Sequence, residues 1–164
     1  MAMTMTGQVT LPADRATVWA ALNDAEILKR SIPGCQELDK TSDTEFTATA
    51  KVAVGPVKAT FKGKVNLNDI DPPNGYTISG EGQGGVAGFA KGGAKVHLAD
   101  GDGGGTQLNY DVEAHVGGKL AQLGGRLING VAKKYADEFF TNFAKALAPE
   151  EAGAVKAEHI VSDA

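Results

Sequence analysis

The chain has 164 residues, of which 42% are hydrophobic, and this size and composition indicate one globular domain rather than a disordered chain. The formal net charge of −4 gives no general attraction to nucleic acid, and no apolar run approaches the ~18 residues that would span a bilayer. The first residues lack the pattern of a signal peptide and the single cysteine excludes an internal disulfide, so we expect a soluble cytoplasmic protein.

The N-terminal part predicts one strand followed by two short helices. The strand covers residues 4–11, and residues 12–14 begin a helix. Apolar residues between positions 18 and 28 recur at helical spacing with a break near residues 23–24, and residues 32–34 end the second piece. Two short helices in this place commonly close one end of a sheet.

Six further strands are predicted between residues 36 and 116, because apolar and polar residues alternate there with a period of two. Glycine-, proline- and asparagine-rich segments at 55–56, 71–75 and 100–105 predict turns between strands, and residues 83–89 form a longer loop. The alternation gives every strand one apolar, inward face and one polar, outward face.

Residues 120–147 are the only long segment whose apolar residues recur at helical spacing. The apolar stripe consists of Leu120, Leu123, Leu127, Val131, Tyr135, Phe139, Phe143 and Leu147. At ~1.5 Å per residue, this helix would span roughly 40 Å and cross a whole small domain. We therefore expect one long C-terminal helix laid across a curved antiparallel sheet, followed by a flexible tail over residues 148–164.

The inward face of the predicted sheet is unusually rich in small residues. These are Ala48, Ala50, Ala59, Gly63, Gly80, Gly82, Gly92, Ala94 and Ala114. Protein interiors are densely packed, so such a face either lets the helix approach closely or leaves room for a ligand. The glycines could alternatively serve strand curvature alone, with the helix aromatics filling the interior. We favour an elongated apolar cavity, because small inward residues occur on five strands.

A hydrophobic molecule in that cavity would be held by burial of apolar area with little polar recognition. The residues that we predict to contact it are Phe61, Tyr76, Ile78, Ala94, Tyr110, Val112, Leu127, Val131, Tyr135 and Phe139. Three of these, the tyrosines, are the only titratable groups of the inferred interior. Because acid–base catalysis needs positioned titratable groups, we predict no catalytic residue.

Metal binding is not indicated by the sequence either. His97 and His115 are predicted to face solvent on different strands, and His159 lies in the tail. These histidines and Cys35 lack the spacing of metal ligands, so we predict no metal site. The glycine-rich residues 80–85 resemble a phosphate-binding loop only superficially, because no strand–turn–helix unit surrounds them.

Two surface features are open to more than one interpretation. Val86 and Phe89, in the loop at 83–89, either tuck into the core or form a gate over the cavity mouth. In the gate interpretation, Val54, Pro56 and Val57 form the opposite lip. Lysines cluster on the predicted hairpin around the turn at 55–56, and we assign contact with an anionic membrane or acidic partner to Lys58, Lys62 and Lys64. The alternative is an ordinary solvated face.

Several segments together carry a family resemblance. They are TGQVTLPADRATVWAALNDAEILKRSIPGCQEL, AVGPVKATFKGKV, DIDPPNGYTISGEGQGGVAGFAKGGAKVHL and VGGKLAQLGGRLINGVAKKYADEFFTNFAKAL. Over residues 3–147 the chain resembles the carbon monoxide dehydrogenase G-subunit family, within the START/Bet v1-like (SRPBCC) superfamily. The resemblance implies one domain of the α+β class with the helix-grip fold. In that fold a seven-stranded antiparallel sheet surrounds a long C-terminal helix, in the order β-α-α-β6-α, with an apolar cavity between them.

The resemblance also implies a function. Members are not catalytic subunits, and the family is thought to link the aerobic, molybdenum-dependent carbon monoxide dehydrogenase to the membrane. We therefore expect a non-catalytic carrier without an intrinsic cofactor, which binds a membrane quinone of the menaquinone kind or another isoprenoid lipid. The three tyrosines are candidates for hydrogen bonds to the quinone headgroup. The protein would be cytoplasmic and peripherally associated with the inner face of the cell membrane, with carbon monoxide dehydrogenase as partner and no nucleic acid.

Two other functions stay open at this stage. The first is an adaptor that recruits the dehydrogenase to the membrane without a small molecule. The second, ranked last because of the apolar interior, is an enzyme of the polyketide cyclase kind. The enzyme would gain support if an acidic residue or a histidine pointed inward.

Overall fold

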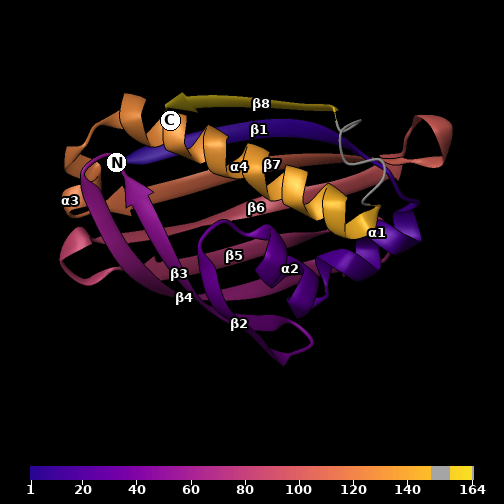
Figure 1. The fold of residues 1–164 in the computed structure, drawn as a ribbon, viewed down its shortest axis with the longest axis horizontal. Coiled ribbons are helices and arrows are strands. Elements are labelled where there is room, and N and C mark those ends of the chain that lie inside the picture. The colour runs from indigo at the N-terminus through magenta and orange to yellow at the C-terminus, as the bar shows by residue number, and fades with distance from the viewer. Residues whose placement is uncertain (149–155, 164) are drawn as a thin grey trace.

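A single antiparallel sheet forms the scaffold of the computed structural model, which describes residues 1–148 and 156–163. Its strands are β1 (Ala2–Leu11), β2 (Cys35–Ser42), β3 (Glu45–Val54), β4 (Val57–Asp71), β5 (Gly75–Gln83), β6 (Phe89–Asp100), β7 (Thr106–Gly117) and β8 (Lys156–Asp163). They lie side by side in the order β2-β3-β4-β5-β6-β7-β1-β8. Helix α4 (Gly125–Leu147) crosses one face of this sheet (Figure 1). This is the predicted helix-grip arrangement.

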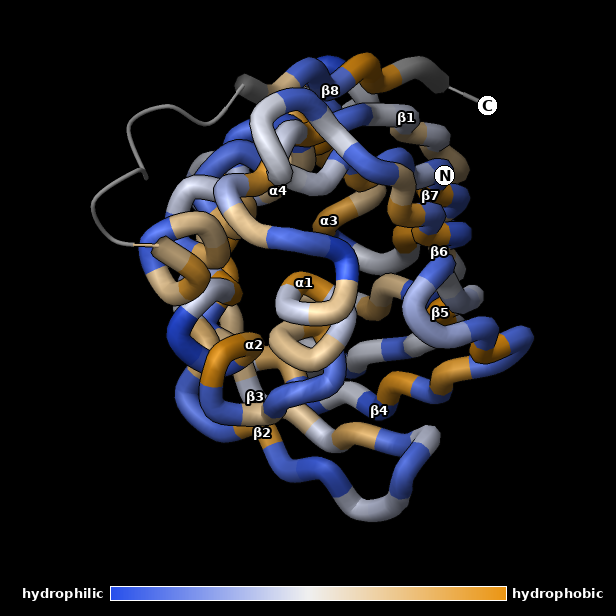
Figure 2. Tube along the Cα trace, turned by 90° about the vertical axis from the view of Figure 1, so that its right-hand side faces the viewer, coloured by the Kyte–Doolittle hydropathy of each residue, from blue (hydrophilic) through white to orange (hydrophobic). Residues whose placement is uncertain are grey.

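The two short helices predicted after the first strand are present as α1 (Arg15–Leu22) and α2 (Ala25–Ser31). Each begins after an aspartate that caps its first turn: Asp14 Oδ1 accepts from the Thr17 N–H at 2.8 Å, and Asp24 Oδ1 accepts from the Glu26 N–H at 2.9 Å. Viewed from the end of the molecule, α1 and α2 lie inside the outline of the curved sheet (Figure 2). They close that end of the interior, as the sequence suggested.

The strand phases derived from the period-two pattern are confirmed. Phe46, Leu67, Leu98 and Leu108, all assigned to the inner face, are buried, whereas the intervening lysines are exposed. His97 and His115 are exposed, as predicted. A slip of one residue would have exchanged the two faces, so each strand must be placed correctly for the core to form.

The prediction of one unbroken helix over residues 120–147 is wrong. A short helix, α3 (Lys119–Gln122), precedes α4, and Gly124 separates them with a φ of +88°. Only glycine adopts this left-handed conformation at little cost, so the chain changes direction there. A regular apolar spacing on both sides of the break conceals it in the sequence.

The break also shifts which residues of α4 face the core. Ile128 and Phe140 are buried, whereas Leu127 of the predicted stripe is 38% exposed. Leu127 instead contacts the β3–β4 turn, because a Cβ added to Gly55 would lie 2.8 Å from its Cδ2. The helix therefore presents two neighbouring apolar rows, one toward the core and one toward the β3–β4 hairpin.

The expectation of seven strands and a flexible tail differs from the structure at one element. Residues 156–163 form β8, which pairs antiparallel with β1 from Met3↔Asp163 to Thr10↔Lys156. The predicted tail also includes residues 149–155 and 164, which lie outside the described residues. β8 forms because the outer edge of β1 offers unpaired backbone groups and α4 lies beside it. Among the described residues, no helix combines the length and hydropathy that crossing a bilayer requires.

Candidate ligand-binding cavity

An apolar cavity of about 340 Å³ lies between the inner face of the sheet and α4, in the half of the molecule that α1 and α2 close. Its walls come from both short helices, from β1–β7 and from α4. They are Met5, Leu22, Leu28, Ile32, Leu38, Phe46, Val65, Leu67, Tyr76, Ile78, Ala94, Val96, Leu108, Tyr110, Val112, Ala136, Phe139 and Phe140. No charged side chain is among them, so the cavity fits an apolar molecule.

Both tyrosines of the cavity wall direct their hydroxyl groups to partners in the protein. The Tyr76 hydroxyl donates to the Leu22 carbonyl at 3.4 Å, and the Tyr110 hydroxyl lies 2.5 Å from His159 Nδ1. Burial raises the pKa of both phenols, that of Tyr110 to about 12. At neutral pH the two tyrosines are uncharged and present their rings to the cavity.

His159 is the polar group that the sequence pattern did not reveal. It was assigned to a flexible tail, but on β8 it is 6% exposed and stacks on Phe140, with ring centroids 5.8 Å apart. Gly7 faces both Tyr110 on β7 and His159 on β8, so the three residues form one row across three strands. A Cβ on Gly7 would lie 2.5 Å from the Tyr110 Cζ, so only glycine lets the phenol reach His159.

The surroundings of His159 favour its neutral form. Desolvation lowers the pKa of His159, Lys133 acts in the same direction, and Asp137 opposes them. Its Nε2 is buried without a hydrogen-bond partner and lies 3.9 Å from Asp137 Oδ1, which is largely exposed on α4. An inward histidine is the feature that supports the enzyme alternative.

The inward glycines leave space below the helix, and at least one of them also allows neighbouring strands to pack closely. At Gly63, Gly80, Gly82 and Gly92 the three atoms nearest an added Cβ all belong to neighbouring strands, and none belongs to α4. The helix therefore does not sink onto these positions. At Gly92, however, the added Cβ would clash with the Glu113 carbonyl oxygen, so this glycine is also needed for close strand packing.

A second hollow, a groove of about 590 Å³, follows the seam between α4 and β3. It is lined by Pro33, Gly34, Lys51, Val52, Ala53, Lys58, Ala59, Thr60, Lys134, Tyr135 and Glu138. Pairing of β2 with β3 ends at Cys35↔Ala50, and the Lys51 N–H still donates to the Gly34 carbonyl at 2.9 Å, so β2 leaves the edge of β3 free beyond Lys51. On this free edge the Tyr135 hydroxyl bonds the backbone of Ala53: it accepts from the Ala53 N–H at 3.2 Å and donates to the Ala53 carbonyl at 3.5 Å. This contact joins α4 to the free edge.

The structure divides the ten predicted ligand contacts into two groups. Six line the cavity: Tyr76, Ile78, Ala94, Tyr110, Val112 and Phe139. Four do not: Tyr135 lies in the groove, Leu127 faces the β3–β4 turn, and Phe61 and Val131 pack against the core outside the cavity wall. On α4, Ala136 and Phe140 line the cavity beside Phe139, whereas the predicted Tyr135 lies in the groove. That any of these residues contacts a ligand stays a prediction.

The predicted gate residues lie at the end of the molecule opposite α1, and none of them lines the cavity. Val54 is buried and Val57 is half-buried, whereas Val86, on the 3-10 turn η1 (Gly85–Ala87), is 84% exposed. Phe89 is 38% exposed, and a Cβ on Gly117 would clash with its ring. Pro56 occupies the exposed β3–β4 turn. Whether these residues gate the cavity stays a prediction.

The three lysines assigned to membrane or partner contact are exposed on the outer face of β4, and their contact with either stays a prediction. Lys58 lies beside the β3–β4 turn, on the rim of the groove. Lys62 and Lys64 lie further along the outer face of β4, where Lys64 pairs with Glu45 at 3.2 Å. Residues 1–148 and 156–163 contain no group of three histidine, cysteine, aspartate or glutamate side chains arranged to hold a metal ion.

Comparison with known proteins identifies a family and several structures that are similar to this chain. The model of the carbon monoxide dehydrogenase G-subunit family, CoxG, matches residues 7–148. The chain belongs to the CoxG family. A conserved protein from Geobacillus kaustophilus of known crystal structure is 30% identical, with 95% of this chain and 98% of that chain covered and a TM-score of 0.85. The search of the curated proteins found no match.

More distant structures share the fold of this CoxG-family chain. A START superfamily protein from Mycobacterium smegmatis is 12% identical, with 90% of this chain and 99% of that chain covered and a TM-score of 0.68. The Zhui aromatase/cyclase from Streptomyces sp. R1128 is 14% identical, with 92% and 95% covered and a TM-score of 0.65. The START-like fold is thus shared by at least one enzyme and does not by itself decide whether this chain is catalytic.

Proposed function

We propose that this CoxG-family chain is a non-catalytic carrier that binds a membrane quinone of the menaquinone kind, or another isoprenoid lipid, in the apolar cavity. The observation that carries the proposal is the cavity itself, about 340 Å³ enclosed by apolar side chains. An isoprenoid chain is apolar and flexible, and each Å² of its surface that leaves water contributes roughly 25 cal/mol. The chemistry of the wall supports such a ligand.

The arrangement of the tyrosines fits holding and releasing a ligand better than transforming it. The hydroxyls of Tyr76 and Tyr110 are engaged with Leu22 and His159, so a hydrogen bond to a quinone oxygen would require them to exchange partners. Such an exchange replaces one hydrogen bond by another and gains little free energy. Binding would depend mainly on the apolar part of the ligand.

The membership of the CoxG family supports a place for this carrier beside carbon monoxide dehydrogenase. In the proposed function, the protein takes quinone from the inner face of the cell membrane, to which it is peripherally bound, and presents it to the dehydrogenase. The dehydrogenase would pass two electrons from carbon monoxide to the quinone, which takes up two protons, and the resulting quinol would return to the membrane respiratory chain. The adaptor alternative shares the partner and the membrane but leaves the cavity without a function.

The carrier proposal is tested by the contents of the cavity. Protein purified from its native host should yield an isoprenoid quinone on organic extraction, and native mass spectrometry should show one ligand per chain after incubation with menaquinone. A chain that stays empty in both experiments would contradict the carrier and leave the adaptor. A matched control is the variant Ala136→Leu, which fills part of the cavity and should take up less quinone.

A second candidate, an enzyme of the cyclase kind, is supported by one observation. Tyr110 lines the cavity and its hydroxyl contacts the buried His159, whose Nε2 faces Asp137. A phenol backed by a neutral imidazole is a group that could donate a proton to a ligand carbonyl. Incubation of the protein with an aromatic polyketide substrate, followed by chromatography, should then show a product that Tyr110→Phe abolishes. Unaltered substrate in every sample would reject this candidate.

A further inference from the structure

The two ends of the molecule differ in charge. Three connections lie at the end farthest from α1: the β3–β4 turn, the β5–β6 loop with η1, and the β7–α4 link with α3. Residues 54–58, 83–91 and 117–127, which form these connections, contain four cationic side chains and no aspartate or glutamate. The four are Lys58, Lys91, Lys119 and Arg126, and all are exposed. We call this surface, together with Met1, the cationic end.

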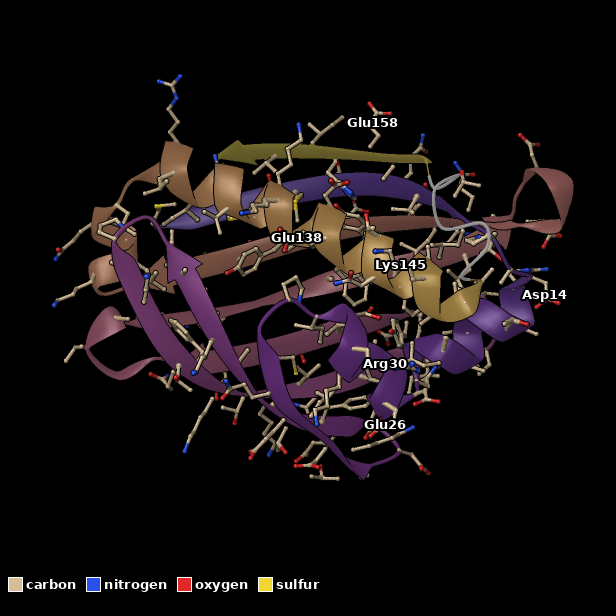
Figure 3. All side chains as sticks on the ribbon, in the orientation of Figure 1. Asp14, Glu26, Arg30, Glu138, Lys145 and Glu158 are labelled. Carbon is tan, nitrogen blue, oxygen red and sulfur yellow. The ribbon has the colours of Figure 1, made fainter. Side chains whose placement is uncertain are left out.

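The opposite end has the reverse composition. Residues 12–15, 69–75 and 100–106 carry Asp14, Asp69, Asp71, Asp100 and Asp102 against the single Arg15. Arg15 is itself paired, with its Nε 3.1 Å from Asp100 Oδ1. Of the acidic residues labelled in Figure 3, Asp14 lies at this opposite end and none lies at the cationic end. A charge separation along the long axis gives the molecule a preferred orientation toward an anionic surface.

The cationic end also carries most of the exposed large apolar side chains. Six such residues are exposed in the described part of the chain: Met1, Ile70, Val86, Phe89, Leu127 and Ile160. Met1, Val86, Phe89 and Leu127 lie at the cationic end. Val86 is the most exposed, at 84%, and a Cβ on the preceding Gly85 would meet no atom within 4 Å. The η1 turn is therefore a protruding apolar tip.

The positive charge at this end is only partly balanced by neighbouring residues. Glu81 on β5 lies opposite Lys91 on β6. The N-terminal ammonium adds a further positive charge, although it donates to the Val116 carbonyl at 3.0 Å. Lys58, Lys119 and Arg126 have no acidic residue in their own connections. Cations that surround exposed apolar side chains are the combination that binds the boundary between lipid headgroups and acyl chains.

We propose that the cationic end docks on an anionic lipid bilayer, with Val86, Phe89 and Leu127 entering the headgroup region and the four cations contacting lipid phosphates. The carrier function proposed above gives a reason for this docking, whereas the evidence for it comes from the charges and exposed apolar residues of the surface. The groove along the seam begins at Lys58, so docking brings one rim of the groove to the bilayer. A lipid chain leaving the membrane would reach the groove between α4 and β3, which the Tyr135–Ala53 contact bridges.

An acidic protein could also bind a cationic surface, but the tip favours lipid. Neither the cavity nor the groove is lined by Val86, Phe89 or Leu127, whereas protein interfaces are built around anchor side chains that fill pockets. Insertion of a short apolar tip needs no complementary pocket. The surface therefore fits a lipid bilayer better than an acidic protein.

Co-sedimentation with vesicles tests the inference. The wild-type chain should bind vesicles of phosphatidylcholine with phosphatidylglycerol, bind less as salt is raised, and bind vesicles of phosphatidylcholine alone weakly. Val86→Asp and Lys119→Gln should each reduce partition, the latter by roughly fivefold. The matched controls are Ile70→Asp and Lys95→Gln, exposed residues away from the cationic end, which should leave partition unchanged.

The outcomes separate this inference from the carrier proposal, because uptake of a short-chain quinone from solution is measured on the same samples. Protein that takes up quinone but does not bind anionic vesicles overturns the docking surface and leaves the carrier. Vesicle binding that Val86→Asp weakens supports the docking surface even if no quinone is taken up. Equal losses in Val86→Asp and Ile70→Asp, or binding to an acidic protein but not to vesicles, would also overturn it. Both substituted valine and isoleucine are exposed, so the variants should fold.

Discussion

Two alanines of α4 offer a direct test of whether the cavity is real. Ala136 lines the cavity, whereas Ala144 is fully buried in the core and does not line it. Substitution by leucine adds three carbon atoms to the same helix in both cases. The two variants therefore share any change in helix propensity and differ only in the space that the new side chain meets.

The expected effects have opposite signs. At Ala136 the added carbons occupy existing space, which contributes about 0.8 kcal/mol per buried CH₂, less ~0.5–1 kcal/mol for the lost rotamer freedom of leucine. Ala136→Leu should therefore stabilise the ligand-free protein by about 1–2 kcal/mol. At Ala144 the same side chain overpacks a filled core, at a cost of about 1–3 kcal/mol.

Thermal and urea unfolding of ligand-free protein measure the difference. For a domain of this size each kcal/mol shifts Tm by roughly 2–4 °C, so the two variants should separate clearly. Ala136→Leu should also weaken binding of an apolar ligand by roughly ten- to fiftyfold, since it displaces ligand carbons of similar burial. Equal destabilisation of both variants would show that the space beside Ala136 is already filled, and the carrier proposal would lose its main support.

Three further predictions concern the contacts around the cavity. Gly7→Ala should displace Tyr110 from His159, lower the free energy of unfolding by about 1–3 kcal/mol and speed hydrogen exchange of the β8 amides. The control Gly130→Ala, whose added Cβ meets no neighbouring atom, should leave that exchange unchanged. Unchanged protection of the β8 amides in Gly7→Ala would contradict the prediction. Because the pKa of His159 is lowered in the folded state, the unfolded state binds the proton first, so stability should fall as pH drops below about 6.5, and His159→Asn should flatten that dependence in urea titrations. A wild-type stability that instead rose below that pH would refute the assignment. Tyr135→Phe should release the free edge of β3, cost about 1 kcal/mol and speed ligand exchange in stopped-flow measurements; an unaltered rate would exclude the seam as the route.

Much of the fold could be predicted from local pattern, because each strand has one buried face and its period of two is visible in the sequence. The turn at 55–56, the helix start at residues 12–14, the break near residues 23–24 and the inward phase of Phe46 all follow from such local signals. These features depend on neighbouring residues only, so a single sequence contains them.

The features that could not be predicted depend on contacts between distant segments. Residues 156–163 are weakly patterned, and they become β8 because β1 presents an edge. The burial of His159 follows from that pairing and from Gly7, 152 positions earlier in the chain. The glycine at position 7, on the otherwise apolar inner face of its strand, is the one available signal, since such a glycine indicates that another group approaches closely.

The helix face illustrates a different limit. The apolar positions of α4 occupy two adjacent rows, and a stepwise reading through Leu127, Val131 and Tyr135 is as regular as one through Ile128, Ala132 and Ala136. The break at Gly124 interrupts the continuous helix that this periodicity predicts, and its backbone conformation leaves no periodic signal in the sequence. Five of the six predicted strand residues line the cavity, all but Phe61, whereas Phe139 is the one predicted residue of α4 that does so.

The size of the cavity limits how a long ligand could be held. At about 340 Å³ it lies near the lower end of the ~300–1,000 Å³ typical of small-molecule sites, so part of an isoprenoid chain would have to lie outside it. The groove and the cavity lie side by side. On α4, Tyr135 lines the groove and the next residue, Ala136, lines the cavity; on the opposite wall, Pro33 lines the groove and Ile32 lines the cavity. Joining the two spaces requires movement of α4 away from the edge of β3, where the Tyr135–Ala53 contact now holds it. A carrier of this design would open along its side, and the Tyr135–Ala53 contact is one of those that opening would break.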